Sequence, residues 1–181
     1  MIVVDSYTPN KRSWVMSRIR SEHTKPELIV RSLLHRCGYR FSLRNHKLPG
    51  RPDLVLPKYR TAIFVHGCFW HRHPGCAMAT MPKTRTAFWQ NKFSRNTERD
   101  QDNQKRLKNA GWQVLVIWEC EILRDPNQTI SQLAHRLDPQ KAAARNPCQY
   151  LPERRHTLRM AENKMHYRLD KSHPKHPGKD A

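Results

Sequence analysis

The 181-residue chain is long enough for one domain with a hydrophobic core and a modest appendage, and its formal net charge is +19, from 34 Lys and Arg against 15 Asp and Glu. No apolar run approaches the roughly 20 residues of a membrane span, and the N-terminus lacks a signal-peptide pattern, so we expect a cytoplasmic protein without a membrane partner. Because such a positive excess repels itself unless a polyanion is near, nucleic acid is the first partner to consider.

Charge and apolar periodicity divide the chain into three regions. Residues 1–22 form a polar arm with basic positions, residues 23–138 carry the pattern of a folded domain, and residues 139–181 are rich in Pro, Lys, Arg and His. The last region holds ten Lys and Arg against four acidic residues, which is +6 and leaves +13 of the total for residues 1–138. We expect a disordered basic tail behind a domain that is itself basic.

The pattern of the folded region predicts an α/β domain, a mixed sheet with helices on its faces. Thr24 and Glu27 can form a capping box, Pro26 fits a first turn, and Gly38 can end this first helix after Cys37. The remaining pattern predicts strands at 39–43, 53–56, 61–66 and 112–118, a loop at 45–52, an irregular segment at 67–82, a helix from Thr84 or Thr86 to about Asn109, and a short helix at 129–137.

A metal site is indicated by cysteines and histidines in the irregular segment. In the cytosol thiols stay reduced, so clustered cysteines bind metal more often than they form disulfides. We expect a structural Zn²⁺ held by Cys68, His73, Cys76 and Cys120, with His71 outside the set. Cys120 could instead be a small buried residue at the end of the last strand.

Two carboxylates and two imidazoles are expected to meet at one edge of the sheet. Hydrolysis of a phosphodiester needs a carboxylate for a metal, a base or water-orienting group, and positive charge on the phosphate. Asp53 begins one strand, His66 ends the next, His71 lies just beyond, and Glu27 is on the first helix. Alone, Asp53 could be a turn former, His66 a strand-end histidine with satisfied hydrogen bonds, and Glu27 only a helix cap. The hypothesis therefore depends on the convergence of these residues at one place.

Five segments of this chain resemble the very-short-patch-repair endonucleases. They are residues 48–53 (LPGRPD), 63–71 (IFVHGCFWH), 84–89 (TRTAFW), 96–100 (NTERD) and 116–120 (VIWEC), and the similarity runs from about residue 10 to residue 137. The resemblance implies a restriction-endonuclease-like fold and Mg²⁺-dependent nicking of one DNA strand on the 5′ side of the thymine in a T·G mismatch. It also implies a monomeric, nucleoid-associated bacterial enzyme, with mismatch-repair proteins as further partners.

The resemblance also implies roles for single residues. Asp53 would bind Mg²⁺ together with the backbone carbonyl of Val65, where the family often has Thr. His71 would be the general base, His66 would assist at the phosphate, and Glu27 would orient water or His71. The spacing between His73 and Cys76 is looser than the family pattern, and the tail beyond residue 140 lies outside it.

Mismatch recognition is expected from an aromatic wedge, because a mispaired step costs less to unstack. By resemblance the intercalating side chains are Phe69, Trp70 and Trp89, although such side chains could also be core residues. Lys92, Asn96 and Asp100 recur every four residues, so they share one helix face that could read base edges or simply face solvent. In the N-terminal arm, Met16, Arg18 and Arg20 would clamp the opposite groove.

Two other functions remain open from the sequence. One is a restriction-type nuclease with the same core and another target, and the other is a non-catalytic, zinc-stabilised DNA-binding module. Both nuclease hypotheses predict that Asp53→Ala abolishes cleavage while DNA binding remains.

Overall fold

The computed structural model describes residues 22–43 and 45–140, together with Thr8, Asn10, Lys11, Trp14 and Ser17. The expectations for Met16, Arg18 and Arg20, and for the tail beyond residue 140, lie outside the described residues. No helix in the described part of the chain is long and apolar enough to cross a membrane.

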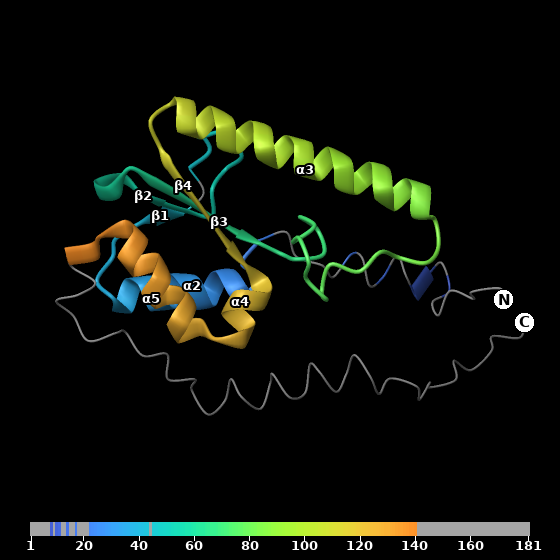
Figure 1. Cartoon of the computed structure of the whole chain (residues 1–181), viewed down its shortest axis with the longest axis horizontal. Helices are drawn as coiled ribbons and strands as arrows, with labels where there is room; N and C mark the ends of the chain where they lie inside the picture. The colour runs from blue at the N-terminus through green and yellow to red at the C-terminus, as the bar shows by residue number, and fades with distance from the viewer. Residues whose placement is uncertain are drawn as a thin grey trace, which may run out of the picture. The chain divides into compact units, whose positions relative to one another are not determined.

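A four-stranded mixed sheet forms the centre of the domain (Figure 1). Its strands are β1 (Ser42–Leu43), β2 (Leu54–Leu56), β3 (Thr61–His66) and β4 (Gln113–Trp118), in that spatial order. The pairs β1–β2 and β2–β3 are antiparallel, whereas β3 and β4 run parallel and pair His66 with Trp118 at their ends. The expected mixed α/β architecture is therefore confirmed.

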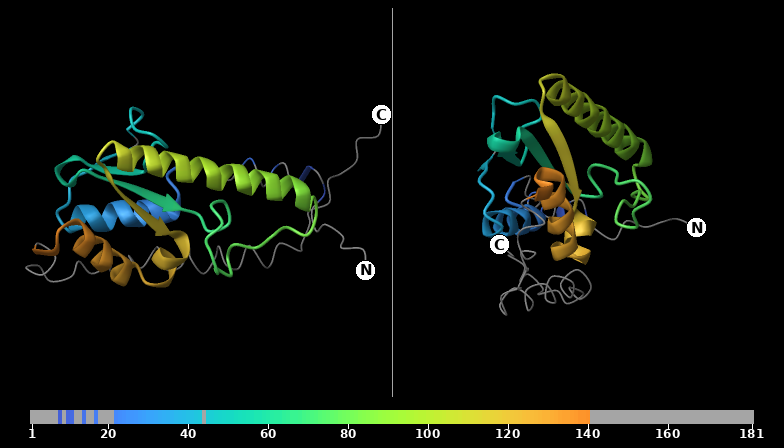
Figure 2. Two further views of the ribbon diagram at one scale, coloured as in Figure 1. Left: turned by 45° about the horizontal axis from the view of Figure 1, so that its top comes forward. Right: turned by 60° about the vertical axis from the view of Figure 1, so that its left-hand side comes forward.

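Helices cover both faces of the sheet (Figure 2). The long helix α3 (Thr86–Asn109) crosses one side and contacts β4, while α2 (Lys25–Arg36), α4 (Glu119–Arg124) and α5 (Pro126–Leu137) pack together on the other. A short 3₁₀ helix, η1 (Pro57–Tyr59), joins β2 to β3. The crossover from β3 through α3 to β4 is the connection that parallel neighbouring strands require.

The first helix begins as the sequence predicts. Thr24 caps α2, the Oε1 atom of Glu27 lies 2.9 Å from the Thr24 hydroxyl oxygen, and Gly38 follows the helix with φ of 75°. Buried apolar side chains on this helix include Ile29, Val30, Leu33 and Leu34. These contacts fix the start of α2, and with it Glu27, next to the sheet.

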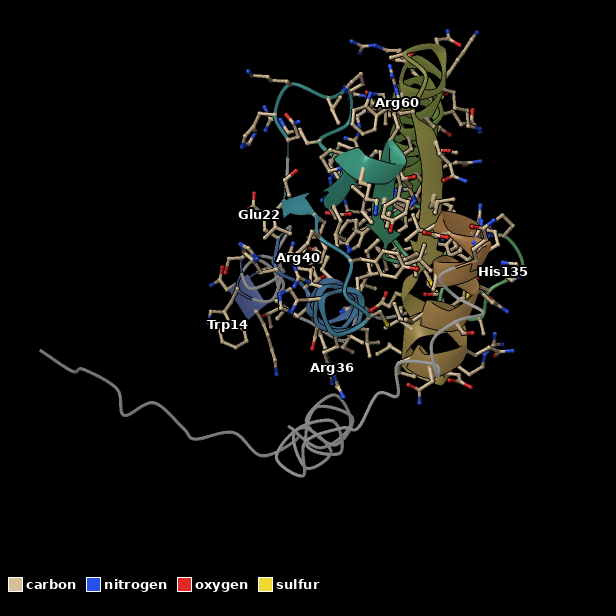
Figure 3. All side chains as sticks on the ribbon, turned by 90° about the vertical axis from the view of Figure 1, so that its left-hand side faces the viewer. Trp14, Glu22, Arg36, Arg40, Arg60 and His135 are labelled. Carbon is tan, nitrogen blue, oxygen red and sulfur yellow. The ribbon has the colours of Figure 1, made fainter. Side chains whose placement is uncertain are left out.

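Buried apolar residues attach α3 to the sheet. Ala62, Phe64 and Leu107 form a buried cluster, against which Leu48, Trp112, Val114 and Val116 pack. At the C-terminal end of α3, Arg60 (labelled in Figure 3) donates a hydrogen bond of 3.1 Å to the carbonyl of Ala110. The anchored C-terminal half leaves the N-terminal half of α3 to extend beyond the strands (Figure 1).

Five local expectations differ from the structure. The strand expected at 39–43 is only Ser42–Leu43. Strand β4 is partly exposed because it is the last strand of the described sheet, although its apolar sequence is typical of a buried strand. Neither Thr84 nor Thr86 caps α3, since Arg85 takes that position with φ of 53°. Cys120 lies in α4, a helix that the sequence did not predict, and α5 starts three residues early because Asp125 caps it before Pro126.

A candidate catalytic cavity beside a candidate metal site

An open cavity of about 1020 Å³ lies where β3 ends. Its walls come from the end of β3, the start of α2, the loop before β2 and the middle of α3. The predicted site residues Glu27, Asp53, Val65, His66, His71, Lys92, Asn96 and Asp100 all line it, together with Trp70, Arg51, Arg99 and Glu119. The fold therefore brings to one place predicted site residues as far apart in the sequence as Glu27 and Asp100.

Two histidines and an aspartate form a cluster in the wall of this cavity. The rings of His66 and His71 are stacked, with centroids 3.8 Å apart and planes 13° apart. The Nδ1 atom of His71 lies 2.5 Å from Oδ2 of Asp100, and one atom from each of the three side chains could reach a common ion. An ionised carboxylate at Nδ1 favours the imidazole tautomer with its proton on Nδ1, which leaves Nε2 as the basic atom.

The charge states in this cluster follow from burial and from the neighbouring groups. Burial lowers the pKa of His66 to about 4, helped by His71 and Arg99 and opposed by Asp100, so His66 is neutral at pH 7. Burial alone would raise the pKa of Asp100, but the hydrogen bond and charge of His71, together with the charges of His66 and Arg99, leave it below its ordinary value. Asp100 is therefore ionised and holds His71 in place.

Asp53 lies immediately before β2, which begins one residue later than predicted. Its Oδ2 atom accepts a hydrogen bond of 2.8 Å from the backbone N–H of Val65, one residue before His66. This bond fixes the carboxylate against the end of β3 and inside the cavity that His66 and His71 also line. A carboxylate oxygen is a hard donor, and Mg²⁺ prefers such ligands, so Asp53 fits the metal role predicted for it.

Glu27 lines the cavity but is engaged by its own helix. Its carboxylate accepts hydrogen bonds from the N–H groups of His23 and Thr24, the Thr24 hydroxyl and Arg31. Arg31 is itself buried, and its Nη2 atom lies 2.6 Å from Oε2 of Glu27. No hydrogen bond joins Glu27 to His71 among the described residues, so its water-orienting role stays a prediction.

A second cluster brings together the four residues expected to hold zinc. The ligand atoms of Cys68, His73, Cys76 and Cys120 all lie within 4.8 Å of one another. Nδ1 of His73 is 3.6 Å from Sγ of Cys68 and 3.2 Å from Sγ of Cys120. Tetrahedral Zn²⁺ with bonds of about 2.0–2.3 Å places its ligand atoms roughly 3.5–3.8 Å apart. Both the donor set and its spacing therefore suit zinc.

The thiols of this cluster respond differently to their surroundings. Burial raises the pKa of Cys68 to about 12 and also raises that of Cys120, whereas a backbone hydrogen bond from Met78 lowers the pKa of Cys76. Metal binding requires thiolates, so a bound cation would displace protons from Cys68 and Cys120. The cluster joins the loop after β3 to α4, because Cys68 follows β3 and Cys120 is the second residue of α4.

The predicted wedge residues form one aromatic group. The Phe69 ring lies 5.0 Å from Trp70, 5.6 Å from Trp89 and 5.1 Å from the buried Phe93, measured between ring centroids. Phe69, Trp70 and Trp89 are half-buried, and Phe88 beside them is 48% exposed. These rings pack on one another at the N-terminal half of α3, so they are neither isolated on the surface nor fully within the core.

The three polar residues expected on one face of α3 do share that face, since all line the cavity. Their environments differ. Lys92 is exposed, the side-chain amide of Asn96 donates a hydrogen bond of 3.2 Å to the carbonyl of Trp70, and Asp100 is bound to His71. Asp100 thus contacts the candidate base, and the base-reading role predicted for it stays a prediction.

Sequence reasoning missed three contacts that organise these sites. Asp100 pairs with His71 across 29 positions, Glu119 accepts a hydrogen bond from the N–H of Cys68, and Trp118 lies between the two clusters. The position of Trp118 and Glu119 just before Cys120 was a usable signal, because a residue beside a metal ligand at a strand end lies near the loop that the metal holds.

Known proteins similar to this chain act on DNA. Residues 4–77 match the family of the DNA mismatch endonuclease Vsr. The chain is 45% identical over 137 residues to the type II nicking enzyme V.XorIIP of Xanthomonas oryzae, covering 76% of this chain and 99% of that protein. It is 40% identical over 136 residues to the DNA mismatch endonuclease Vsr of Escherichia coli, covering 75% and 86%. A Neisseria meningitidis nicking enzyme, V.NmeAIP, is 44% identical, covering 66% and 85%.

Proposed function

Because this chain belongs to the family of Vsr DNA mismatch endonucleases, we propose that it nicks one strand of a DNA duplex on the 5′ side of the thymine in a T·G mismatch. Such mismatches arise when 5-methylcytosine is deaminated, and the nick would start their repair. The observation that carries the proposal is the cluster of His66, His71 and Asp100 in the same cavity as the anchored carboxylate of Asp53.

His71 would act as the general base of the reaction. Asp100 holds the proton at Nδ1, so Nε2 of His71 accepts a proton from the attacking water. The water oxygen forms a bond to phosphorus, and one ester P–O bond on the 5′ side of the thymine breaks. The sugar oxygen that leaves takes up a proton from solvent. His66, neutral and stacked on His71, keeps that ring in place and borders the phosphate.

Asp53 and the carbonyl of Val65 would hold Mg²⁺ at the cavity. A bound Mg²⁺ stabilises the negative charge that builds up on the phosphate oxygens. The use of a backbone carbonyl makes the Val at position 65 compatible with this role. Arg99 lines the cavity 3.6 Å from Asp100 and is well exposed, so its guanidinium can also reach a phosphate.

Zn²⁺ at Cys68, His73, Cys76 and Cys120 would have a structural role. With four protein donors no position remains for substrate, which is typical of structural zinc sites. The loop that it would hold carries Phe69 and Trp70, and a wedge must be rigid to separate stacked bases. Lys92 and Asn96 border the same cavity and would contact the DNA beside this wedge.

The proposal is tested by comparing T·G, T·A and C·G duplexes of otherwise identical sequence in the presence of Mg²⁺. With each strand labelled at its 5′ end, we expect one product, from the thymine strand of the T·G duplex, cut on the 5′ side of that thymine. Equal cutting of matched duplexes would favour a nuclease with another target. Tight binding without any cut would favour a non-catalytic DNA-binding module.

A further inference from the structure

The indole ring of Trp118 contacts one histidine from each of the two clusters. The ring of the candidate zinc ligand His73 stacks on it, with centroids 4.1 Å apart and planes 9° apart. The ring of His66 meets the same indole at 5.4 Å and 75°, in an edge-to-face arrangement. One half-buried side chain therefore separates the metal-binding residues from the catalytic ones and touches both.

The ring contacts continue from His66 into the candidate base. His66 stacks on His71 at 3.8 Å, and His71 is bound to Asp100. A continuous row of side chains thus runs from His73 through Trp118, His66 and His71 to Asp100. Stacked and edge-to-face ring pairs have defined geometries, so a shift at one end of the row displaces the rings beyond it.

The backbone around Trp118 is held on both sides. Its N–H donates a hydrogen bond of 3.0 Å to Oε2 of Glu121, at the start of α4. Parallel pairing places Trp118 directly beside His66 in the sheet. Cys120 and Cys68 each follow these strand ends by two residues, so the Cys/His cluster fixes both ends at once. Trp118 consequently has little freedom to move relative to His66.

We propose that Trp118 is a positioning residue that transmits the fixed geometry of the Cys/His cluster to His66 and, through it, to His71. The proposal rests on the function proposed above. In this view the metal cluster stabilises the loop after β3 and, by way of one indole, also holds the base in its reactive position. A misplacement of about 1 Å at a reacting group can cost on the order of 10²-fold in rate, so the indole is expected to affect catalysis.

Substitutions of Trp118 test this role against ordinary packing. Trp118→Ala removes the ring, Trp118→Phe keeps a smaller flat ring, and Trp118→Leu keeps apolar volume without a flat ring. Val116→Ala is the matched control, because Val116 is a half-buried residue two positions earlier on the same strand and packs against the buried cluster of Ala62, Phe64 and Leu107. It controls for a general loss of stability in β4.

Four quantities are measured for each full-length variant: bound zinc per chain, the Kd for a T·G duplex without Mg²⁺, the single-turnover nicking rate with Mg²⁺, and the imidazole signals in ¹⁵N-histidine NMR. The signals of the two catalytic-cluster histidines are assigned with His66→Gln and His71→Gln. We expect Trp118→Ala to keep zinc and Kd close to wild type, to lose on the order of 10²-fold in rate, and to shift both imidazole signals. Trp118→Phe should recover most of the rate, and Val116→Ala should resemble wild type.

The proposal is overturned if Trp118→Ala nicks as fast as Val116→Ala, or if its rate falls only in proportion to lost zinc. If Trp118→Ala does not fold, Trp118→Leu is measured in its place. Nicking by Trp118→Leu at the wild-type rate would show that no flat ring is needed at this position and would overturn the proposal. Failure of the proposed function is recognised separately, as a wild-type protein that does not nick the T·G duplex. The NMR comparison then still decides whether Trp118 holds the two imidazoles.

Discussion

The pairing of His71 with Asp100 is the residue-scale feature on which the proposed chemistry depends. An imidazole accepts a proton efficiently at one nitrogen only if the other is protonated and oriented, and Asp100 provides this at 2.5 Å. The low pKa of Asp100, to which the hydrogen bond and charge of His71 contribute, keeps the carboxylate ionised at neutral pH. Spacing along α3 could not show this contact, because His71 belongs to a loop whose path the Cys/His cluster helps to fix.

Asp100→Asn removes the charge and keeps the shape. We expect the single-turnover nicking rate on a T·G duplex to fall by about 10²–10⁴-fold, the usual contribution of a positioned general base, while the Kd for DNA changes little. Asp102→Asn is the matched control, since its carboxylate is on the same helix, 65% exposed and 3.8 Å from Arg106. Equal nicking rates in the two variants would remove Asp100 from the mechanism.

At the scale of elements, local signals predicted most of the fold and contacts between distant segments escaped prediction. The bounds of α2 could be predicted from Thr24, Glu27 and Gly38, because capping interactions act within a few residues. The apolar run of β3 likewise predicted the central strand. The four candidate zinc residues could be chosen since three lie within nine positions and cysteine is rare. Helix α4 was missed because its six residues are set by Glu121 capping the backbone of Trp118 and by the position of Cys120.

The loop after β3 is the element that should depend on the metal. We expect Cys76→Ser to lower bound zinc per chain, lower the Tm and expose residues 67–85 to limited proteolysis, because the loop has little regular structure to hold it otherwise. Cys37→Ala, at the end of α2 and outside the cluster, should retain zinc. Full zinc in the Cys76→Ser protein would show that the metal is held by other residues.

The aromatic group at the start of α3 should determine mismatch preference. Trp70 borders the cavity, and its carbonyl is held by Asn96. Stacking of a base on an aromatic ring contributes about 1–3 kcal/mol, so Trp70→Ala should reduce the ratio of T·A to T·G Kd values by about 5- to 150-fold. Titration of both duplexes without Mg²⁺ measures this ratio, in which a general loss of affinity cancels. An unchanged ratio would assign Trp70 to packing alone.

At the scale of the whole molecule, the net charge of +19 governs encounters with DNA. Lysines and arginines that neutralise phosphates release counterions, so affinity for any duplex falls as salt rises. With about 6–10 phosphate contacts, we expect the Kd for a matched duplex to rise by about 10³–10⁵-fold between 50 and 200 mM salt, and the Kd ratio of matched to mismatched duplex to change far less. A flat salt dependence in fluorescence-anisotropy titrations would contradict a phosphate-based interface.

The most direct measurement for the central claim is single-turnover nicking of a T·G duplex with Mg²⁺ by the wild-type chain and by Asp53→Ala. If Asp53 anchors the metal beside His66 and His71, the variant should lose nicking by several orders of magnitude and still bind the duplex with nearly wild-type Kd. Nicking by Asp53→Ala at the wild-type rate would contradict the account, because the cavity at the end of β3 would then not be the place where the strand is cut.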